Sequence, residues 1–365
     1  MSETRTKKRI IYLDYLRVIA ITGVLLNHIS TNWIGGPFLN EFIALFYNSA
    51  GRIGVPLFLM LTGILLLNNK LPIKAFIKRR YPRVILPFVF WMGLYILYKM
   101  FVWEPSLLNG NPLQYAIVSF LSDRWYVWMI LGVYLIIPIF AGFIKGTKLD
   151  GVKYFLIIWI ITTALITLSK TFGFNLHYLD LVIFSGPIGF LMLGYYLHNK
   201  EIKMSPKKVI IISLLVFIIL TIIKTVLLSQ FLDLSYSFRY YIFTVKSHLE
   251  NDTLSILQVA ALFLIIKYIP MVKSGFYQKI TEFCNRKRML LLIISISQAS
   301  YGIYLCHYFI TYTLKNILKL HDIAFSSMPS IVLVPLLTIV VLLLAYAIIL
   351  ITNKVPVINK FTGYH

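Results

Sequence analysis

The chain has 365 residues, of which 59% are hydrophobic and only 13% are charged, and its formal net charge is +22. Soluble domains are usually about a quarter charged, whereas a mean hydropathy of +0.81 is typical of a polytopic membrane protein. The basic residues stand in short clusters between apolar runs, which favours membrane topology over nucleic-acid binding. A nucleic-acid partner is therefore not expected.

Ten apolar runs are long enough, or nearly so, to cross a bilayer as helices, which takes about 20 residues each. In chain order they are 10–32, 45–68, 84–103, 126–144, 154–170, 180–198, 208–229, 253–271, 289–314 and 329–352. The run near 113–121 is too short to span and is expected to be an interfacial or re-entrant piece. The predicted fold class is all-α, with about ten transmembrane helices in a single domain over residues 1–365.

The lysines and arginines predict how these helices are oriented. Of the 35, 25 fall in the N-terminal tail, the alternate loops and the C-terminal tail, 6 in the opposite loops, and four within spans. The positive-inside rule therefore predicts cytosolic tails over 1–9 and 353–365, with both termini in the cytoplasm. We expect a multi-pass protein of the plasma membrane, surrounded by membrane lipid.

The first span contains "LDYLRVIAITGVLLNHIS" (13–30), with Asp14, Arg17 and His28. Charges within a span are expensive, roughly 2.5 to 3.5 kcal/mol each on insertion scales. Arg17 and His28 are 11 residues apart, so they share one helix face and are separated by about 16 Å along the axis. Asp14 lies one turn before Arg17, at the spacing of an ion pair. The alternative for this pair is a purely structural role near the lipid headgroups.

The ninth span carries a second polar stripe. Ser300, Tyr304 and His307 lie at positions i, i+4 and i+7, which places them on one face. His307 and His28 are each 18 residues from the cytosolic start of their spans. If the two helices tilt alike, the imidazoles lie at similar depth and line one cavity. The alternative is a histidine satisfied by a neighbouring hydroxyl.

The chain resembles the acyltransferase-3 family of integral membrane acyltransferases, whose first span carries an arginine, ten residues and a histidine, here Arg17 and His28. The resemblance continues in "GRIGVPLFLMLTGILLL" (51–67), "KRRYPRVILPFVFW" (78–91), "RWYVWMILGVYLIIP" (124–138), "FLMLGYYL" (190–197) and "SQASYGIYLCH" (297–307). Two departures bear on the glycan and acyl preferences. "SDRW" lacks the histidine often found before this tryptophan, and Pro56 occupies a position that is acidic in many relatives.

This resemblance implies O-acyl transfer, most simply of acetyl, from cytosolic acyl-coenzyme A to a hydroxyl of a cell-surface or lipid-linked carbohydrate, with no metal. His28 would be the general base that activates the hydroxyl. Arg17 would be a fixed positive charge for the donor or the developing negative charge, and Asp14 would hold Arg17 in place. His307 is the second candidate catalytic residue and a possible resting place for the acyl group.

The cytosolic segment between the second and third spans carries Arg80 and Arg83, which match an RxxR segment of the family. Arginine forks bind phosphate oxygens well, so these two are the predicted acyl-coenzyme A site. Positive-inside topology with attraction to anionic lipid is the alternative. Trp125, Ser300 and Tyr304 are the predicted substrate-binding residues.

The outer loop 235–252 is aromatic, and Tyr240 and Tyr241 are candidates for stacking on sugar rings. Two other functions are compatible with ionisable residues in spans. One is a transporter or lipid-linked glycan flippase. The other is a non-catalytic protein that assists surface-polysaccharide biosynthesis proteins. No pseudo-twofold repeat supports the first, and the intact Arg17 and His28 pair argues against the second.

Overall fold

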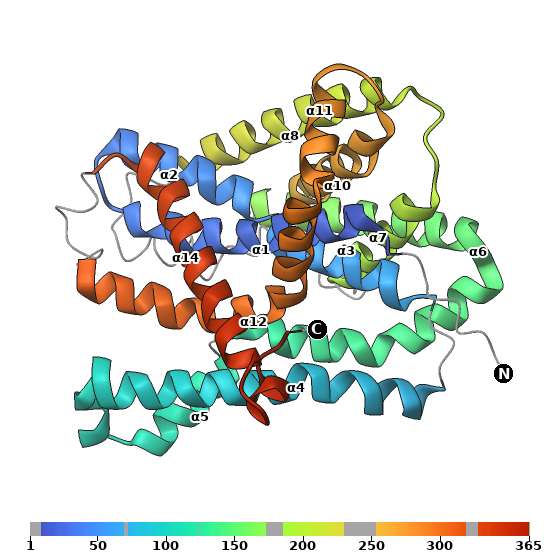
Figure 1. Cartoon of the computed structure of the whole chain (residues 1–365). Coiled ribbons are helices and arrows are strands. Elements are labelled where there is room, and N and C mark those ends of the chain that lie inside the picture. The colour runs from blue at the N-terminus through green and yellow to red at the C-terminus, as the bar shows by residue number, and fades with distance from the viewer. Residues whose placement is uncertain are drawn as a thin grey trace.

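The computed structural model describes residues 9–68, 72–122, 124–172, 185–229, 253–318 and 328–364, and within these ranges it contains helices and no strand (Figure 1). The helices are α1 (Ile11–Ser30), α2 (Phe38–Gly51), α3 (Gly54–Leu66), α4 (Ile73–Tyr98), α5 (Pro112–Ser122), α6 (Trp125–Phe172), α7 (Ile188–Asn199), α8 (Pro206–Ser229), α10 (Thr253–Tyr268), α11 (Gly275–Asn285), α12 (Lys287–Leu318) and α14 (Ser330–Asn353). The predicted all-α class is confirmed.

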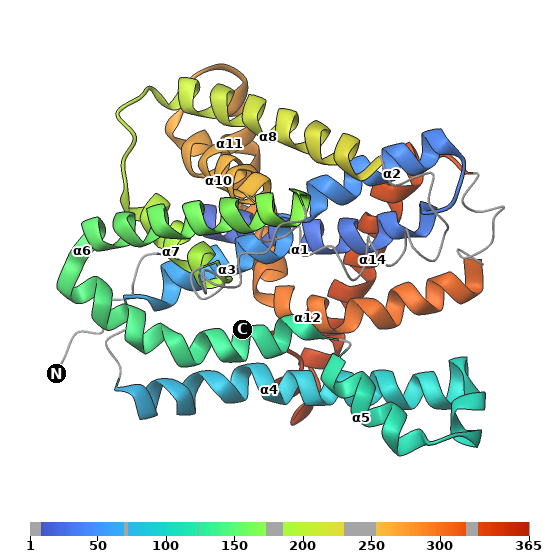
Figure 2. The ribbon, with the colours of Figure 1, turned by 180° about the vertical axis from the view of Figure 1, so that it is seen from behind.

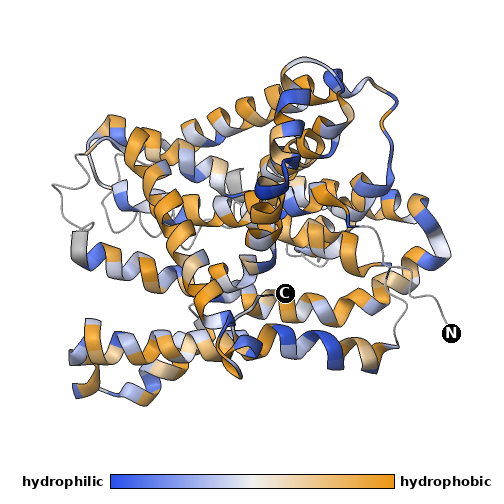
Figure 3. Cartoon of the chain, in the orientation of Figure 1, coloured by the Kyte–Doolittle hydropathy of each residue, from blue (hydrophilic) through white to orange (hydrophobic). Residues whose placement is uncertain are grey.

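Hydrophobic residues dominate most of these helices, and hydrophilic residues gather at the bend of α6 and in the N-terminal part of α4 (Figure 3). Within the described residues, seven helical segments are long and apolar enough to cross a membrane. They are Phe38–Leu66, Ile73–Trp103, Trp125–Ser169, Pro206–Ser229, Thr253–Met271, Lys287–Asn316 and Ser330–Asn353. The chain is therefore a polytopic integral membrane protein.

Seven segments are found in the described residues where ten spans were predicted, because two predicted spans fall within one helix and two others are not among the seven. The predicted fourth and fifth spans both fall within α6, which folds back as a hairpin at Lys148, a residue with a φ of 56° (Figure 2). Neither α1, with its charged residues, nor α7, which has 12 residues, is among the seven. The ten-span count and the cytosolic placement of both termini stay predictions.

Two predicted boundaries were wrong. The second span was expected over 45–68, but the helical segment covers 38–66 and is interrupted at Arg52 and Ile53, between α2 and α3. The third was expected to begin at 84, but α4 begins at Ile73, so the basic segment is helical rather than a loop. The short apolar piece near 113–121 is the helix α5, which is too short to span, as predicted.

Helix α1 lies at the centre of the bundle, packed against α2, α3, α12 and α14 (Figure 1). Its contact with the α2–α3 break is close because glycines leave room there. A Cβ at Gly51 would lie 2.7 Å from the carbonyl oxygen of Gly23, and one at Gly54 would lie 2.7 Å from that of Ala20. This close approach brings the interrupted segment with Arg52 against the C-terminal half of α1.

Candidate active site

The N-terminal end of α1 carries a chain of polar contacts. Arg9 donates from Nε and Nη2 to both carboxylate oxygens of Asp14, at 2.7 Å each. Ser297 on α12 donates to Asp14 Oδ1 at 2.7 Å, and Arg17 Nη1 donates to Ser297 Oγ at 3.3 Å. The expected direct pair of Asp14 and Arg17 was therefore wrong. Because Arg9 forms a bidentate pair with the carboxylate, Arg17 is joined to Asp14 through a hydroxyl.

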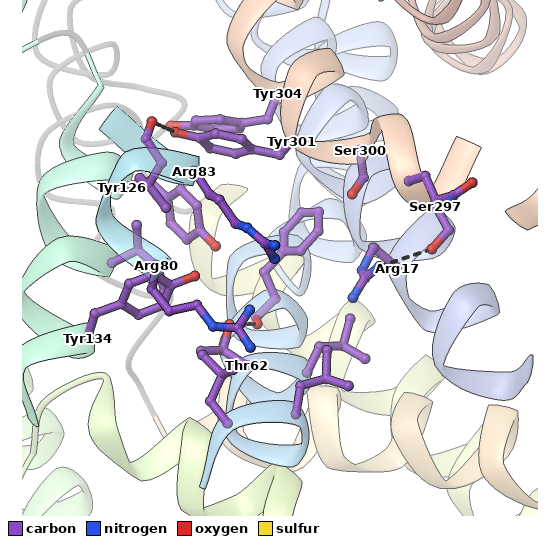
Figure 4. Close-up of a pocket in the computed structure, with 17 residues that line it drawn as sticks. Arg17, Thr62, Arg80, Arg83, Tyr126, Tyr134, Ser297, Ser300, Tyr301 and Tyr304 are labelled. Atoms are coloured by element: carbon purple, nitrogen blue, oxygen red, sulfur yellow. Dashed lines mark hydrogen bonds between the residues drawn. The ribbon is translucent and has the colours of Figure 1, made fainter. Parts of the chain in front are cut away.

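A cavity of about 220 Å³ opens beside this chain of contacts (Figure 4). Arg17 from α1 and Arg80 and Arg83 from α4 all line it, together with the hydroxyl-bearing Thr62 and Ser300. The Nε atom of Arg80 is buried and has no hydrogen-bond partner among the described residues. The predicted donor-site arginines and the arginine of the first span thus share one cavity, in which Nε of Arg80 is available to an anionic ligand.

A second cavity, of about 40 Å³, lies toward the C-terminal half of α1. It is lined by His28, Arg52 and Trp125, among others. Arg52 is 3% exposed, and its Nε donates to Asn48 Oδ1 at 2.9 Å. Trp125 is 52% exposed and forms part of the cavity wall. This places an ionisable imidazole and a buried guanidinium in one small polar space.

His28 and His307 lie side by side, with their ring centroids 5.3 Å apart. The two imidazoles lie close together, as expected from their equal depth, but His307 lines neither cavity, so the expectation that both line one cavity was wrong. Tyr308 places its hydroxyl 3.2 Å from Nδ1 and 3.3 Å from Nε2 of His28. His307 Nδ1 lies 2.6 Å from the carbonyl oxygen of Tyr304. Since a carbonyl only accepts, Nδ1 carries the proton.

This tautomer leaves the other ring nitrogen of His307 with a lone pair. Nε2 is buried and has no hydrogen-bond partner among the described residues, and the side chain is fully buried. The alternative of a histidine satisfied by a hydroxyl therefore does not describe His307. Buried polar atoms are nearly always paired, so an orphan of this kind is typical of a functional site.

Several residues of this region were missed from the sequence. Arg124 is buried, and its guanidinium lies 3.9 Å from the centre of the Tyr308 ring and 4.8 Å from that of Tyr95. It stands in the "SDRW" departure, so this chain places a cation close to the histidine pair. Arg52 carried a usable signal, because a charge inside a span normally faces a cavity. Ser297 carried none.

The predicted residues fall into two groups. Arg17, Arg80, Arg83, Ser300 and Tyr304 line the larger cavity, and His28, Trp125 and Tyr304 line the smaller one. Asp14 lies next to the larger cavity, where it accepts a hydrogen bond from Ser297. His307 lies next to the smaller cavity, beside His28. Tyr240 and Tyr241 are outside the described residues. Within the described ranges, no group of three or more His, Cys, Asp or Glu side chains is placed to hold a metal ion.

Comparison with known proteins gives a family. Residues 10–350 match a family model described as an acyltransferase domain. An amino-acid racemase of Enterococcus faecalis is 26% identical over an alignment of 259 positions, which covers 62% of this chain and 35% of that protein. This chain thus spans about a third of that relative's length. No solved structure matches the chain. Because the family match covers nearly the whole chain, this integral membrane protein belongs to the acyltransferase-3 family.

Proposed function

We propose that this membrane acyltransferase moves an acyl group, most simply acetyl, from cytosolic acyl-coenzyme A to a hydroxyl of a cell-surface or lipid-linked carbohydrate. The observation that carries the proposal is the pair of adjoining cavities. One is lined by three arginines and the other by His28, with His307 beside it. A phosphate-bearing donor and a hydroxyl acceptor need these two environments. The plasma membrane is the expected location, beside proteins of surface-polysaccharide biosynthesis.

The donor end of the proposal rests on charge and access. Arg83 is exposed and Arg80 is partly buried, while Arg17 reaches the same cavity from the opposite helix. Guanidinium forks bind phosphate oxygens through paired N–H groups. The phosphates of coenzyme A would lie against Arg80 and Arg83, and Arg17 would lie deeper, toward the thioester. The orphaned Nε of Arg80 supports an anionic ligand there.

The chemical step needs a base at the acceptor oxygen. That oxygen forms a bond to the acyl carbonyl carbon, and the carbon–sulfur bond of the thioester breaks. The hydroxyl proton passes to a ring nitrogen of His28 and then to the leaving sulfur, which gives free coenzyme A and the ester. His28 lines the smaller cavity, and the hydroxyl of Tyr308 lies within hydrogen-bonding distance of it. A positioned base contributes about a hundredfold to ten-thousandfold in rate.

The test uses membranes that contain the full chain, acyl-coenzyme A labelled in its acyl group, and an extract of lipid-linked and polymeric glycans. The readout is label in an alkali-labile glycan ester. We expect His28→Ala to lower transfer by about a hundredfold or more, and Arg80→Gln to raise the KM for the donor. Arg79→Gln is the matched control, because Arg79 is exposed on the same helix and does not line the cavity.

Each outcome has a distinct meaning. If transfer survives in His28→Ala, His28 is not the general base, and His307, with its Nε2 lone pair, is the next candidate. If Arg79→Gln and Arg80→Gln change the KM for the donor equally, the basic segment serves only to orient the chain in the membrane. Absence of transfer from acetyl, succinyl and longer donors, over a broad acceptor panel, refutes the proposal. It would favour a transporter or an accessory protein of surface glycan export.

A further inference from the structure

The two cavities meet at a pair of tyrosine rings. Among the described residues, Tyr126 on α6 and Tyr304 on α12 are the ones that line both cavities. Their ring centroids are 5.1 Å apart and the rings stand edge to face, at 65°. Both side chains are buried. Figure 4 shows the two tyrosines on the wall of the larger cavity. The aromatic pair is thus the partition between the arginine side and the histidine side.

The cavity beyond the partition is small. Its volume of about 40 Å³ has room for about three water molecules. The smaller cavity is therefore about the size of a two-carbon acyl group. Every acyl group that reaches His28 passes the rings of Tyr126 and Tyr304, since the larger cavity ends against them, but a chain too long for the small cavity would also have to hold the rings apart. Protein interiors are close-packed and resist such a displacement.

We propose that Tyr126 and Tyr304 form a gate that the acyl group enters on its way to His28, and that this gate limits the enzyme to short acyl groups. The inference rests on the proposed function, because it presumes a donor on the arginine side and a base on the other. Tyr304 also has a second tie to the site. Its backbone carbonyl accepts a hydrogen bond from Nδ1 of His307, so one residue of the gate and one of the two histidines lie on the same turn of α12.

The test compares kcat/KM for acetyl-, propionyl-, butyryl- and hexanoyl-coenzyme A in the full-length protein. Wild-type protein is expected to prefer acetyl, and Tyr126→Ala and Tyr304→Ala to raise the butyryl-to-acetyl ratio by about tenfold or more, since each methylene in a tight pocket is worth about that much. The Tyr304 substitution keeps the carbonyl that holds His307. Tyr134→Ala is the matched control on α6, because Tyr134 lines only the larger cavity, and its ratio should equal that of wild type.

Two further variants guard against misfolding. Tyr126→Phe keeps the ring and should keep the wild-type ratio, whereas Tyr126→Leu is a milder widening to use if the alanine variant does not accumulate. Wild-type protein that uses hexanoyl as well as acetyl, or a chain-length profile unchanged in Tyr126→Leu and Tyr304→Ala, would overturn the gate while leaving acyl transfer intact. Absence of transfer from every donor in wild type would instead refute the proposed function.

Discussion

Substitution of Ser297 is the sharpest test of how Arg17 is held in place at the N-terminal end of α1. The hydroxyl of Ser297 donates to Asp14 and accepts from Arg17, so it is the link between the two charged residues of α1. Among the described residues, Ser297→Ala removes that link and no other side-chain hydrogen bond. Ser295→Ala is the matched control. Ser295 lies on the same helix and contacts the hydroxyls of Tyr346 and Tyr364, neither of which lines the larger cavity.

The magnitude follows from what the substitution leaves behind. A buried polar group deprived of its partner costs about 1 to 3 kcal/mol. Arg9 still pairs with both oxygens of Asp14, and the bond from Arg17 is long, at 3.3 Å. The effect therefore belongs in the lower part of that range, about 1 to 2 kcal/mol. At 1.36 kcal/mol per factor of ten, that is about 5- to 30-fold.

We expect this factor in the KM for acyl-coenzyme A, with the KM for the glycan acceptor unchanged, because Arg17 lines the arginine-bearing cavity and not the one beside His28. A fall in kcat at unchanged donor KM would instead assign Arg17 to charge developed in the transition state. Donor kinetics within twofold of wild type, or an equal effect of Ser295→Ala, would refute the idea that Ser297 positions Arg17. The melting temperature in detergent serves as the folding control.

Two further predictions concern the helix contacts that hold the site in place. Gly54→Ala should lower the melting temperature in detergent, because its Cβ would lie 2.7 Å from the carbonyl oxygen of Ala20, and overpacking costs about 1 to 3 kcal/mol; Gly132→Ala, with nothing within 4 Å of its Cβ, should not. Lys267→Met should also destabilise the protein, since its Nζ donates to three carbonyls at the end of α7 at 2.6 to 3.0 Å. Lys273→Met, at an exposed lysine, should leave the melting temperature unchanged.

Depth along a helix could be predicted from the sequence, because the rise per residue is constant. Counting from the cytosolic start of each span placed His28 and His307 at one level, and their rings are 5.3 Å apart. Positions on one face were predictable for the same reason. Arg17 and Ser300 both reach the larger cavity, as does the predicted donor arginine Arg80.

Contacts between helices could not be predicted in this way. The partner of Asp14 is Arg9, which precedes the helix, so helical spacing says nothing about it. Tyr304 was predicted to bind substrate, but its contact with Tyr126 joins two helices that are far apart in sequence, and nothing in the sequence singled out Tyr126. The break at Arg52 depends on the close approach of glycines to α1. Such features follow from tertiary packing, which single-helix periodicity does not contain.

The contacts between α1 and α12 indicate which wall of the site can move. These helices are joined near the N-terminal end of α1, where Arg17 donates to Ser297, and again near its C-terminal end, where Tyr308 contacts His28. A slide of one helix along the other by one turn, about 5.4 Å, would break both contacts at once. The two contacts therefore hold α1 and α12 in one register. Tyr126 stands on the other side, on α6. Opening of a passage between the two cavities therefore falls to Tyr126 and α6, while the arginine and the histidines keep their spacing on α1 and α12.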